Sequence, residues 1–313
     1  MSIYLPNTMC IIIASHISNP TRIPYLIECL KSLTSQTIPI TIYLSISFDQ
    51  TIDVNSFMQN IETPQIRILV REQKTPQMRH IQLTFSKLSA EYEWIMFCDD
   101  DDTYVANRVE RIAETIVQGL NAYNLLLRGV YESTFGKDHR EHRHEFWCYC
   151  IHRDVLGKFL NKLEPYPDVL ENKCCDVLLA EFIRRSNPEN IYIPIREQLY
   201  NYRVENNNDS VTGFIKTNQS LYTNITSPPP FDSAEWITYV LNWNDYLHEN
   251  IKIFLHDTYL RTLIGVDFED ILLAEFRINR SLLEYVDVSH LTKMRELYDR
   301  VHMVCDEIYY IKL

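Results

Sequence analysis

The segment "WIMFCDDDDTY" places four consecutive aspartates, Asp99–Asp102, directly after an apolar run. Neighbouring carboxylates repel one another, so such a cluster is costly unless water or a cation surrounds it. Mg²⁺ and Mn²⁺ prefer carboxylate oxygens and usually keep open positions for substrate phosphates. Alternate residues leaving a strand point the same way, so a pair such as Asp99 and Asp101 could present carboxylates to one ion. The alternative interpretation is a solvated turn in which Asp102 or Thr103 caps the next helix.

Short apolar runs alternate with helical patterns from residue 9 to about 120. The strand candidates are "MCIIIASH", "ITIYLSISFD", "QIRILVRE" and "EWIMFCDD", and the helix candidates are "RIPYLIECLKSL", "MRHIQLTFSKLSAEY" and "VANRVERIAETIVQGL". Strands that alternate with helices predict βαβ units, and hence an α/β fold with a mostly parallel sheet flanked by helices. Ligands of such sheets bind outside the carboxyl ends of the strands. Because Ser15, His16 and Asp49 also follow strand candidates, we expect them at the same edge as the aspartates.

The rest of the chain contains two further parts. Residues 121–213 include the strand candidates "NLLLRGVYES", "EFWCYCIH" and "NIYIPI" and helical segments over 153–163 and 175–185. The proline-rich "TSPPPFD" can continue neither a helix nor a central strand. Beyond it the chain is amphipathic and helical. We therefore predict a first domain over 1–225 and a helical C-terminal extension over 226–313.

Composition argues against several classes of function. The formal net charge of −12 disfavours nucleic acid or an anionic membrane as the main partner. We expect no transmembrane segment and no signal peptide, because no apolar run could span a bilayer and the N-terminus lacks a basic flank and a cleavage site. Eight irregularly spaced cysteines indicate reduced thiols and a cytoplasmic location. With only 6 glycines, and neither G-x-G-x-x-G nor a Walker A motif, a glycine-rich phosphate loop is excluded.

Taken together, the motifs resemble those of family 2 glycosyltransferases, whose GT-A fold is a Rossmann-like nucleotide-sugar-binding domain. "CIIIASH", "YLIECLKSLTSQT" and "IYLSISFDQT" correspond to the family's first strand, helix and second strand. "FCDDDDTYVANRV" corresponds to its D-x-D motif and the arginine that follows, here Arg108. "CDVLLAEFIRR" resembles the family's "ED..L..R" element, and "IPIREQLYNYRVENNNDSVT" its closing segment, with Tyr202, Arg203 and Ser210 at the marked positions. The resemblance covers residues 9–213.

This resemblance implies metal-dependent, inverting transfer of a sugar from a nucleotide diphosphate sugar, with a UDP-sugar favoured, to a hydroxyl group of a glycan, glycoconjugate or protein. The ligands implied for the metal ion, Mn²⁺ or Mg²⁺, are Asp99, Asp101 and Asp102. The donor-binding candidates are Ser15, His16, Asp49, Arg79, Asp100 and Arg203. Among them Asp49 would hold the nucleoside, and Arg79 and Arg203 the phosphates. Asp176 is the implied general base, with Glu171 a weaker substitute.

Three departures from the family pattern bear on these roles. The usual "P-T-Y-N" turn is "A-S-H-I", with two extra residues before the helix, so we expect a differently shaped nucleobase pocket. "D-G-S" is replaced by "D-Q-T", which retains Asp49. The family's acid pair "E-D" is Cys175–Asp176, which leaves Asp176 as the acid at that position.

Two other classes of protein stand as alternatives. A nucleotidyltransferase is also α/β and depends on aspartates and a metal, but "ASHISNPTRIP" lacks the glycine-rich signature expected after its first strand. A non-catalytic sugar-binding relative would be expected to lack the aspartates or the base.

A histidine- and cysteine-rich segment has a simpler explanation than a zinc site. The residues concerned are His139, His142, His144, Cys148 and Cys150. Their H-x-H and C-x-C spacings fit no common structural-zinc pattern. We therefore expect a polar loop followed by a strand with both cysteines in the core.

The helical extension carries aromatic residues whose role the sequence leaves open. Trp236, Trp243 and Tyr246 could stack on sugars, but their helical spacing favours a position in a core. The extension could also form a homodimer or dock the acceptor.

Overall fold

The computed structural model describes residues 5–49, 57, 61, 63–133, 145–185, 191–203, 229–231, 233–276, 278 and 280–309. The chain forms two compact units, Met1–Val204 with Ile308–Leu313, and Glu205–Glu307, and each is described by itself. The predicted domain boundary at 225/226 lies outside the described residues. So do four residues named from the sequence: His139, His142, His144 and Ser210.

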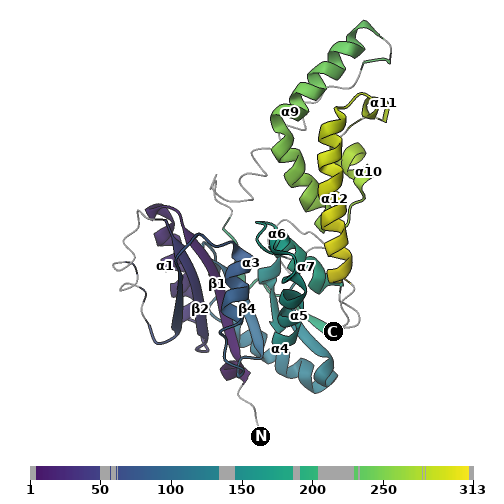
Figure 1. The fold of residues 1–313 in the computed structure, drawn as a ribbon. Coiled ribbons are helices and arrows are strands. Elements are labelled where there is room, and N and C mark those ends of the chain that lie inside the picture. Colours follow the sequence, from purple (N-terminus) through teal and green to yellow (C-terminus); the bar gives the residue numbers. More distant parts are fainter. Residues whose placement is uncertain are drawn as a thin grey trace. The chain divides into compact units, whose positions relative to one another are not determined.

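The first unit contains a seven-stranded sheet (Figure 1). Its strands are β1 (Met9–Ile17), β2 (Thr41–Phe48), β3 (Ile66–Arg71), β4 (Trp94–Asp99), β6 (Leu127–Glu132), β7 (Tyr149–His152) and β8 (Ile191–Ile195). Their order is β3-β2-β1-β4-β7-β6-β8, and all neighbours are parallel except β7, which is antiparallel to both β4 and β6. Two short strands, β5 (Thr103–Tyr104) and β9 (Tyr200–Asn201), form a separate antiparallel pair. The predicted α/β fold with a mostly parallel sheet is confirmed.

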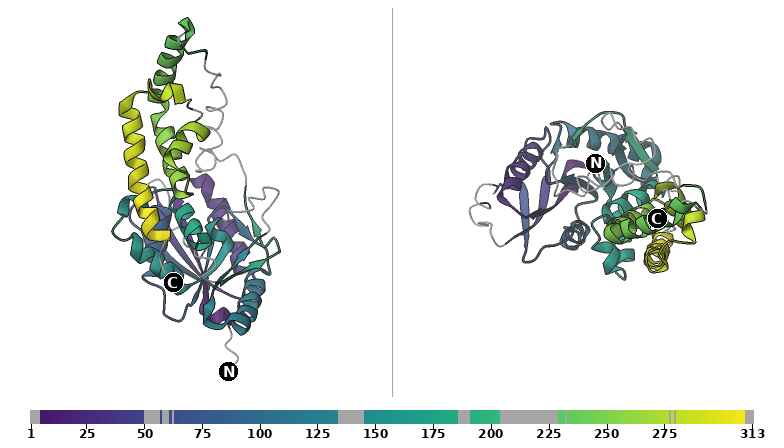
Figure 2. Two further views of the ribbon diagram at one scale, coloured as in Figure 1. Left: turned by 90° about the vertical axis from the view of Figure 1, so that its right-hand side faces the viewer. Right: turned by 90° about the horizontal axis from the view of Figure 1, so that it is seen from above.

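Helices lie on both sides of this sheet (Figure 2). The α-helices are α1 (Ile23–Thr34), α3 (Gln77–Phe85), α4 (Arg108–Tyr123), α5 (Arg153–Leu163), α6 (Pro167–Leu170) and α7 (Cys175–Arg185). The 3₁₀ turns are η1 (Leu5–Thr8), η2 (Pro20–Arg22), η3 (Asn124–Leu126) and η4 (Phe146–Cys148). Helices α3 and α5 both pack against α7. The apolar face expected for α1 is buried through Leu26, Leu30 and Leu33.

Strand β1 explains why the predicted site residues come to one edge. Its residues 9–13 are all buried, as a central parallel strand requires because helices cover both of its faces. Strand β1 pairs with β4 so that Ala14 lies opposite Asp99, and with β2 so that Ile17 lies opposite Phe48. The carboxyl ends of these three strands therefore meet at one edge of the sheet.

The segment after β4 does not cap a helix. Helix α4 begins at Arg108 with Asn107 as its N-cap residue, so neither Asp102 nor Thr103 has that role. Thr103 belongs instead to β5, where it pairs with Asn201. The alternative interpretation of the aspartates as a helix-capping turn is therefore wrong.

The cysteines and the helices bear on two expectations drawn from composition. All eight cysteines are free thiols with buried side chains, including Cys148 and Cys150, which the sequence assigned to the core. Among the helices in the described part of the chain, none has the length and apolar character that crossing a membrane requires.

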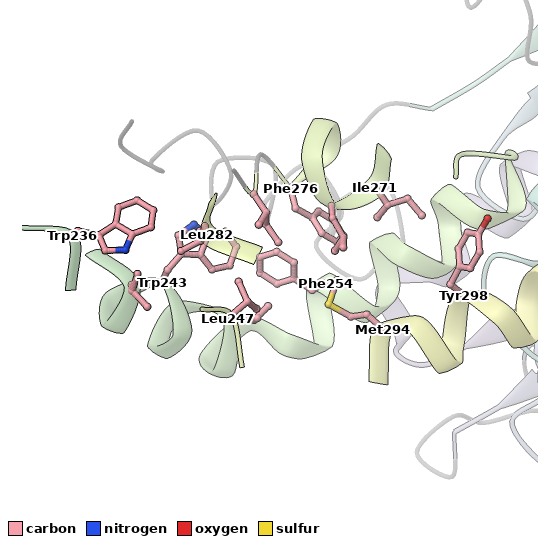
Figure 3. Packing of buried hydrophobic residues seen from close by; sticks show 13 residues of the cluster. Trp236, Trp243, Leu247, Phe254, Ile271, Phe276, Leu282, Met294 and Tyr298 are labelled. Atoms are coloured by element: carbon pink, nitrogen blue, oxygen red, sulfur yellow. The ribbon is translucent and has the colours of Figure 1, made fainter. Parts of the chain in front are cut away.

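The second unit is helical and has an apolar core of its own. Its elements are α9 (Ala234–Leu263), α10 (Phe268–Asp270), the π-helical turn η5 (Ile271–Glu275), α11 (Arg280–Leu283) and α12 (Val288–Tyr309). The ring of Phe254 lies 4.8 Å from that of Phe276 and 5.8 Å from that of Trp243, measured between centroids (Figure 3). Trp236 and Trp243 are both buried in this core and Tyr246 packs against it, so the expected core positions are confirmed.

Candidate active site

Asp99 ends β4 in a partly buried, negatively charged environment. Gln77 Nε2, on α3, donates to Asp99 Oδ1 over 2.9 Å. Burial raises the pKa of Asp99 well above its usual range, and the charges of Asp102 and Asp101 raise it further. The charge of Asp176, in the first turn of α7, acts on the pKa of Asp99 in the same direction. Carboxylates from separate parts of the chain therefore act on one another at this edge of the sheet.

Asp100 and Asp101 face an arginine at the end of η2. Arg22 Nη2 lies 2.7 Å from Asp100 Oδ1 and 3.7 Å from Asp101 Oδ2. Ser15 Oγ donates to the other oxygen of Asp100, Oδ2, over 2.6 Å, so both oxygens of Asp100 have partners within the protein. Asp101 is more accessible, with 27% of its side chain exposed. Burial and the charge of Asp100 raise the pKa of Asp101.

Asp102 is buried and is held by the segment that follows β8. Tyr200 Oη donates to Asp102 Oδ2 over 2.7 Å, and the backbone N–H of Arg203 donates to Asp102 Oδ1 over 2.7 Å. Burial raises the pKa of Asp102 to about 7, although these two hydrogen bonds act against it. Arg203 also donates from Nε to the carbonyl oxygen of Asp101 and from Nη2 to Glu28 Oε2. The 200–203 segment therefore holds the turn formed by the aspartates.

Polar side chains at the ends of β1 and β2 lie beside this turn. His16 Nδ1 lies 2.9 Å from Ser47 Oγ, and His16 Nε2 lies 3.3 Å from Asp49 Oδ1. Burial and the charge of Lys74 lower the pKa of His16, and the charge of Asp49 opposes this effect. About half of the Asp49 side chain is exposed, so its carboxylate is accessible to a ligand.

Asp176 and Arg79 have different surroundings. Asp176 has a partly exposed side chain at the start of α7 and lies within electrostatic reach of Asp99. Arg79, on α3, donates from Nη1 to Gln82 Oε1 over 2.5 Å and places Nε 3.8 Å from Glu171 Oε1. The contacts described for Arg79 therefore join it to α3 and to the end of α6, not to the aspartates.

A comparison with family models identifies the family of this chain. Residues 10–175 match the family described as "Glycosyl transferase family 2". The chain belongs to glycosyltransferase family 2. The resemblance drawn from the motifs is thus confirmed, and the protein is a glycosyltransferase. The matched segment contains Ser15, His16, Asp49 and the run Asp99–Asp102, and it ends one residue before Asp176.

Solved structures show weaker likenesses to this glycosyltransferase. S. aureus TarS matches with a TM-score of 0.41 and 12% identity over 96% of this chain, which spans about half (54%) of the TarS chain. TarS 1–349 in complex with UDP-GlcNAc matches with a TM-score of 0.44 and 11% identity, over 96% of this chain and 90% of that one. A cytidylyltransferase from Leptospira borgpetersenii matches with a TM-score of 0.43 and 8% identity, over 79% of this chain and 96% of that one. These likenesses are too weak to bear on the substrate. A search of curated proteins gave no significant match.

The acidic turn of the glycosyltransferase fits a divalent ion that is bound together with a diphosphate. Within the described residues, no group of three or more carboxylate, imidazole or thiol side chains is arranged to enclose an ion. Sites for Mg²⁺ or Mn²⁺ with substrate phosphates need only one or two carboxylates, since phosphates and water complete the coordination. Asp99 and Asp101 provide such a pair. Burial and the charges of neighbouring aspartates raise the pKa of both, and a cation would offset these charges.

Three residues that hold the aspartates are absent from the candidates named from the sequence: Gln77, Arg22 and Tyr200. Tyr200 lies within "QLYNYR", but the family pattern marks Tyr202 and Arg203 instead. Arg22 was visible only as a basic residue between the first strand and the first helix. No fixed spacing links these residues to the aspartates, because the contacts join segments that are far apart along the chain.

Proposed function

We propose that this glycosyltransferase moves a sugar, with inversion, from a nucleotide diphosphate sugar to an acceptor hydroxyl in a metal-dependent reaction. The donor we propose is a UDP-sugar, and the acceptor a glycan, a glycoconjugate or a protein. One observation carries the proposal: the turn of aspartates lies at the carboxyl end of β4, within the segment that matches glycosyltransferase family 2. The charge of Asp176 raises the pKa of Asp99, which supports counting Asp176 with this site as the candidate base.

The donor half of the proposal assigns the metal to Asp99 and Asp101. Both oxygens of Asp102 accept hydrogen bonds within the protein, so we assign Asp102 to anchoring the turn. A bound Mn²⁺ or Mg²⁺ supplies charge that stabilises the departing diphosphate, which is worth several kcal/mol in the transition state. Asp100 is held by Ser15 and Arg22 and would keep the turn in place beside the phosphates.

The nucleoside and phosphate contacts are assigned to side chains around the turn. Asp49 and His16, at the ends of β2 and β1, would hold the ribose or base, since the Asp49 carboxylate is accessible and fixed beside His16. Arg203 would contact a phosphate, because its guanidinium lies at the turn itself. Arg79 would do so only if it leaves Glu171, from which it is separated by 3.8 Å.

The acceptor half of the proposal assigns the general base to Asp176. As the acceptor oxygen forms its bond to the anomeric carbon, the bond from that carbon to the diphosphate breaks, and the acceptor's proton passes to the Asp176 carboxylate. A base must lie within hydrogen-bond reach of that proton. The support for Asp176 in this role is its partly exposed side chain at the start of α7.

The proposed working compartment is reducing, such as the cytoplasm. Its support is that all eight cysteines are free and buried, including Cys29 and Cys98, whose sulfurs lie only 3.7 Å apart. Two thiols this close remain free most readily in a compartment that keeps cysteines reduced.

Nucleotide binding by the full chain tests the proposal. UDP, GDP and CDP would be titrated by calorimetry with and without Mn²⁺, and a panel of nucleotide sugars assayed for hydrolysis. We expect UDP to bind, and to bind at least about tenfold more weakly without Mn²⁺ or after Asp101→Asn, since even the outer partners of metal ligands contribute 10- to 100-fold. Asp154→Asn, which removes an exposed carboxylate on α5, is the control and should bind UDP normally. No binding or turnover of any nucleotide sugar, together with unchanged behaviour of Asp101→Asn, would refute the proposal.

A further inference from the structure

Behind the acidic turn lies a fully buried ion pair. Arg108, the first residue of α4, places Nη1 2.8 Å from Glu132 Oε2 at the end of β6, with side chains that are 1% and 3% exposed. Removing two charges from water costs more than their attraction usually returns, so such a pair is weak evidence for stability. The contacts around the pair indicate what else it does.

The pair holds the backbone of the segment that reaches the active site. Glu132 Oε1 accepts hydrogen bonds from the backbone N–H of Leu199 over 2.6 Å and of Tyr200 over 3.1 Å. The guanidinium carbon of Arg108 lies 4.4 Å from the centre of the Tyr104 ring and 4.8 Å from that of Tyr200. Glu132 therefore holds the backbone at the start of β9, and Arg108 packs on the ring of Tyr200, the first residue of that strand.

Aromatic stacking completes this support. Arg108 Nη2 donates to the carbonyl oxygen of Trp147 over 3.0 Å. The Trp147 ring stacks on Tyr200 at 3.8 Å between centroids, with an interplanar angle of 12°. The Tyr200 ring thus contacts both an arginine and a tryptophan, which restrain the position of its hydroxyl group.

That hydroxyl group is the connection to the aspartates. Tyr200 Oη donates to Asp102 and accepts a hydrogen bond from the backbone N–H of Asp99 over 3.1 Å. Further along the same segment, Arg203 donates from its backbone to Asp102 and from Nε to the carbonyl oxygen of Asp101. These contacts between the 199–203 segment and the aspartates therefore depend on where Glu132 and Arg108 place that segment.

We propose that Arg108 and Glu132 are positioning residues for metal-dependent nucleotide binding, acting through Tyr200 and Arg203 on the turn of aspartates. The part of this inference that concerns nucleotide binding rests on the proposed function. The part that concerns the position of the 199–203 segment does not. The two charged groups contact each other, the carbonyl oxygen of Trp147, the ring of Tyr104 and the 199–200 segment. We therefore expect their effect to reach the turn through the backbone and ring of Tyr200.

The same two parts of the chain provide a matched control. Arg111, one turn along α4, pairs with Glu197 at 2.5 Å, and 39% and 42% of these side chains are exposed, against 1% and 3% for Arg108 and Glu132. Exposed pairs of this kind contribute little, because water and salt screen them. Glu197 lies only two residues before Leu199. The variant Glu197→Gln therefore tests whether removing any negative charge near this segment has the same effect as Glu132→Gln.

Hydrogen exchange in the metal-free full chain is the first readout. In Glu132→Gln, a neutral oxygen replaces the carboxylate that accepts from Leu199 and Tyr200, and we expect the exchange of these amides to become about tenfold faster or more. In Glu197→Gln their exchange should match the wild type. Unchanged exchange in Glu132→Gln would overturn the proposal, whatever the protein binds.

Affinity for UDP with Mn²⁺ is the second readout. Glu132→Gln should weaken it by about 10- to 100-fold, the range typical when an outer partner of a metal ligand is lost, and Glu197→Gln should not change it. Wild-type affinity in a folded Glu132→Gln would overturn the proposal. If the wild type itself bound no nucleotide, the proposed function would fail, and the exchange experiment would still decide whether the pair positions the segment.

A double variant separates positioning from mere stability. Arg108→Met with Glu132→Leu replaces the buried ions by apolar side chains, an exchange that often maintains or raises stability. We expect this variant to melt at or above the temperature of Glu132→Gln but to bind UDP and Mn²⁺ no better, because it cannot accept from Leu199 and Tyr200. Recovery of both stability and affinity would show that the pair acts only through stability.

Discussion

Asp101 and Asp102 are neighbours in the chain but have opposite surroundings. Asp102 is 1% exposed, and both of its oxygens accept hydrogen bonds from the 200–203 segment. Asp101 keeps 27% of its side chain exposed and has Arg22 3.7 Å away. The burial of one carboxylate fixes the backbone from which the other extends. A run of four identical residues therefore contains at least two physical tasks, anchoring and ligand contact.

Asp176→Asn is expected to abolish sugar transfer while sparing donor binding. The amide has almost the same shape as the carboxylate but cannot take up the acceptor's proton. Because general-base catalysis contributes about 10²–10⁴-fold, we expect kcat to fall by that factor. The affinity for UDP and Mn²⁺, measured by calorimetry, should change little. Initial rates of transfer to an acceptor found in a glycan panel measure the effect on kcat.

Glu171→Gln is the matched control for Asp176→Asn. Glu171 is the other acid considered at this position, and its carboxylate lies 3.8 Å from Arg79 near the end of α6. The variant should transfer sugar at close to the wild-type rate. Loss of transfer in Glu171→Gln, with transfer retained in Asp176→Asn, would move the base to Glu171.

His80 links residue-scale chemistry to the stability of the fold. Its ring is buried, with nitrogens 2.8 Å from Ser45 Oγ and 3.4 Å from Ser47 Oγ. Burial, and then the charges of Arg71 and His16, lower the pKa of His80 from 6.5 to about 4. The folded protein therefore binds this proton more weakly than the unfolded chain does. The contribution of the neutral His80 ring to stability is therefore complete above the unfolded pKa of 6.5, and it is lost as the pH falls towards 4.

His80→Asn should therefore flatten the acid side of the stability profile. Asn keeps a polar group beside Ser45 but has no proton to gain in this range. Between pH values of about 7 and 4, we expect the free energy of unfolding of the wild type to fall by up to about 3 kcal/mol more than that of the variant. Urea unfolding at the two pH values measures the difference, with His302→Asn, on the exposed side of α12, as control. Identical pH dependence in the wild type and His80→Asn would contradict the buried, neutral ring.

At the scale of elements, the positions of strands and helices follow from local patterns, whereas strand partners do not. The run "EFWCYCIH" is predicted to be a strand, but only Tyr149–His152 forms β7, and Phe146–Cys148 is a 3₁₀ turn. Nothing in the run indicates that β7 lies antiparallel between β4 and β6. Its direction is set by distant pairs, since Ile151 pairs with Ile95 on one side and Gly129 on the other. A one-dimensional pattern shows which residues are apolar, and the fold decides what covers them.

The candidate site divides in the same way. Ser15, His16, Asp49 and the aspartates were predicted at one edge because chain direction alone sends the ends of parallel strands there, and the structure brings them together. Arg79 was assigned from its place in a helix, yet its described partners are Gln82 and Glu171. The partner of a long helical side chain depends on tertiary contacts that the sequence does not display. The chemical roles of all these residues stay predictions.

Strand β6 provides an element-scale test at Gly129. A β-carbon there would lie 2.7 Å from the carbonyl oxygen of Cys150 and 2.9 Å from the Tyr192 ring. The Cys150 backbone belongs to β7 and cannot withdraw without disturbing its pairing with β4. We therefore expect Gly129→Ala to lower the free energy of unfolding by about 1–3 kcal/mol, measured by urea denaturation.

Gly157→Ala, on α5, is the control for this overpacking. The nearest atom to its added β-carbon would be the edge of the Phe85 ring at 3.2 Å, a side chain that can shift. Alanine also favours a helix over glycine by about 1 kcal/mol, so stability should be equal or higher. Equal stability of Gly129→Ala and Gly157→Ala would show that the β7 backbone can move away from the added β-carbon despite its pairing with β4.

At the scale of the whole molecule, the family match and the compact units do not coincide. The match ends at residue 175, whereas the second unit is Glu205–Glu307. The residues proposed to bind the donor all belong to the first unit, and the second unit has a separate apolar core. Stability of the second unit and donor binding by the first should therefore respond to different substitutions.

Phe254→Ala tests this independence. Phe254 is fully buried, and its ring contacts those of Trp243, Tyr246 and Phe276. Truncating such a ring removes apolar contacts and leaves a cavity, which typically costs about 3–5 kcal/mol. A protein of two units need not unfold in one step. We expect differential scanning calorimetry to show one transition moved to lower temperature and the other in place. The affinity for UDP and Mn²⁺ should equal that of the wild type.

Ile237→Ala is the control on the same helix, since its side chain is exposed and its loss should change stability by no more than about 0.5 kcal/mol. If Phe254→Ala moved no transition, the packing around its ring would not be what stabilises the second unit. If it weakened UDP binding as much as Asp101→Asn does, the donor site would depend on the second unit, and its assignment to the first unit alone would be wrong. Because the two outcomes affect different measurements, one variant tests the core and the placement of the site separately.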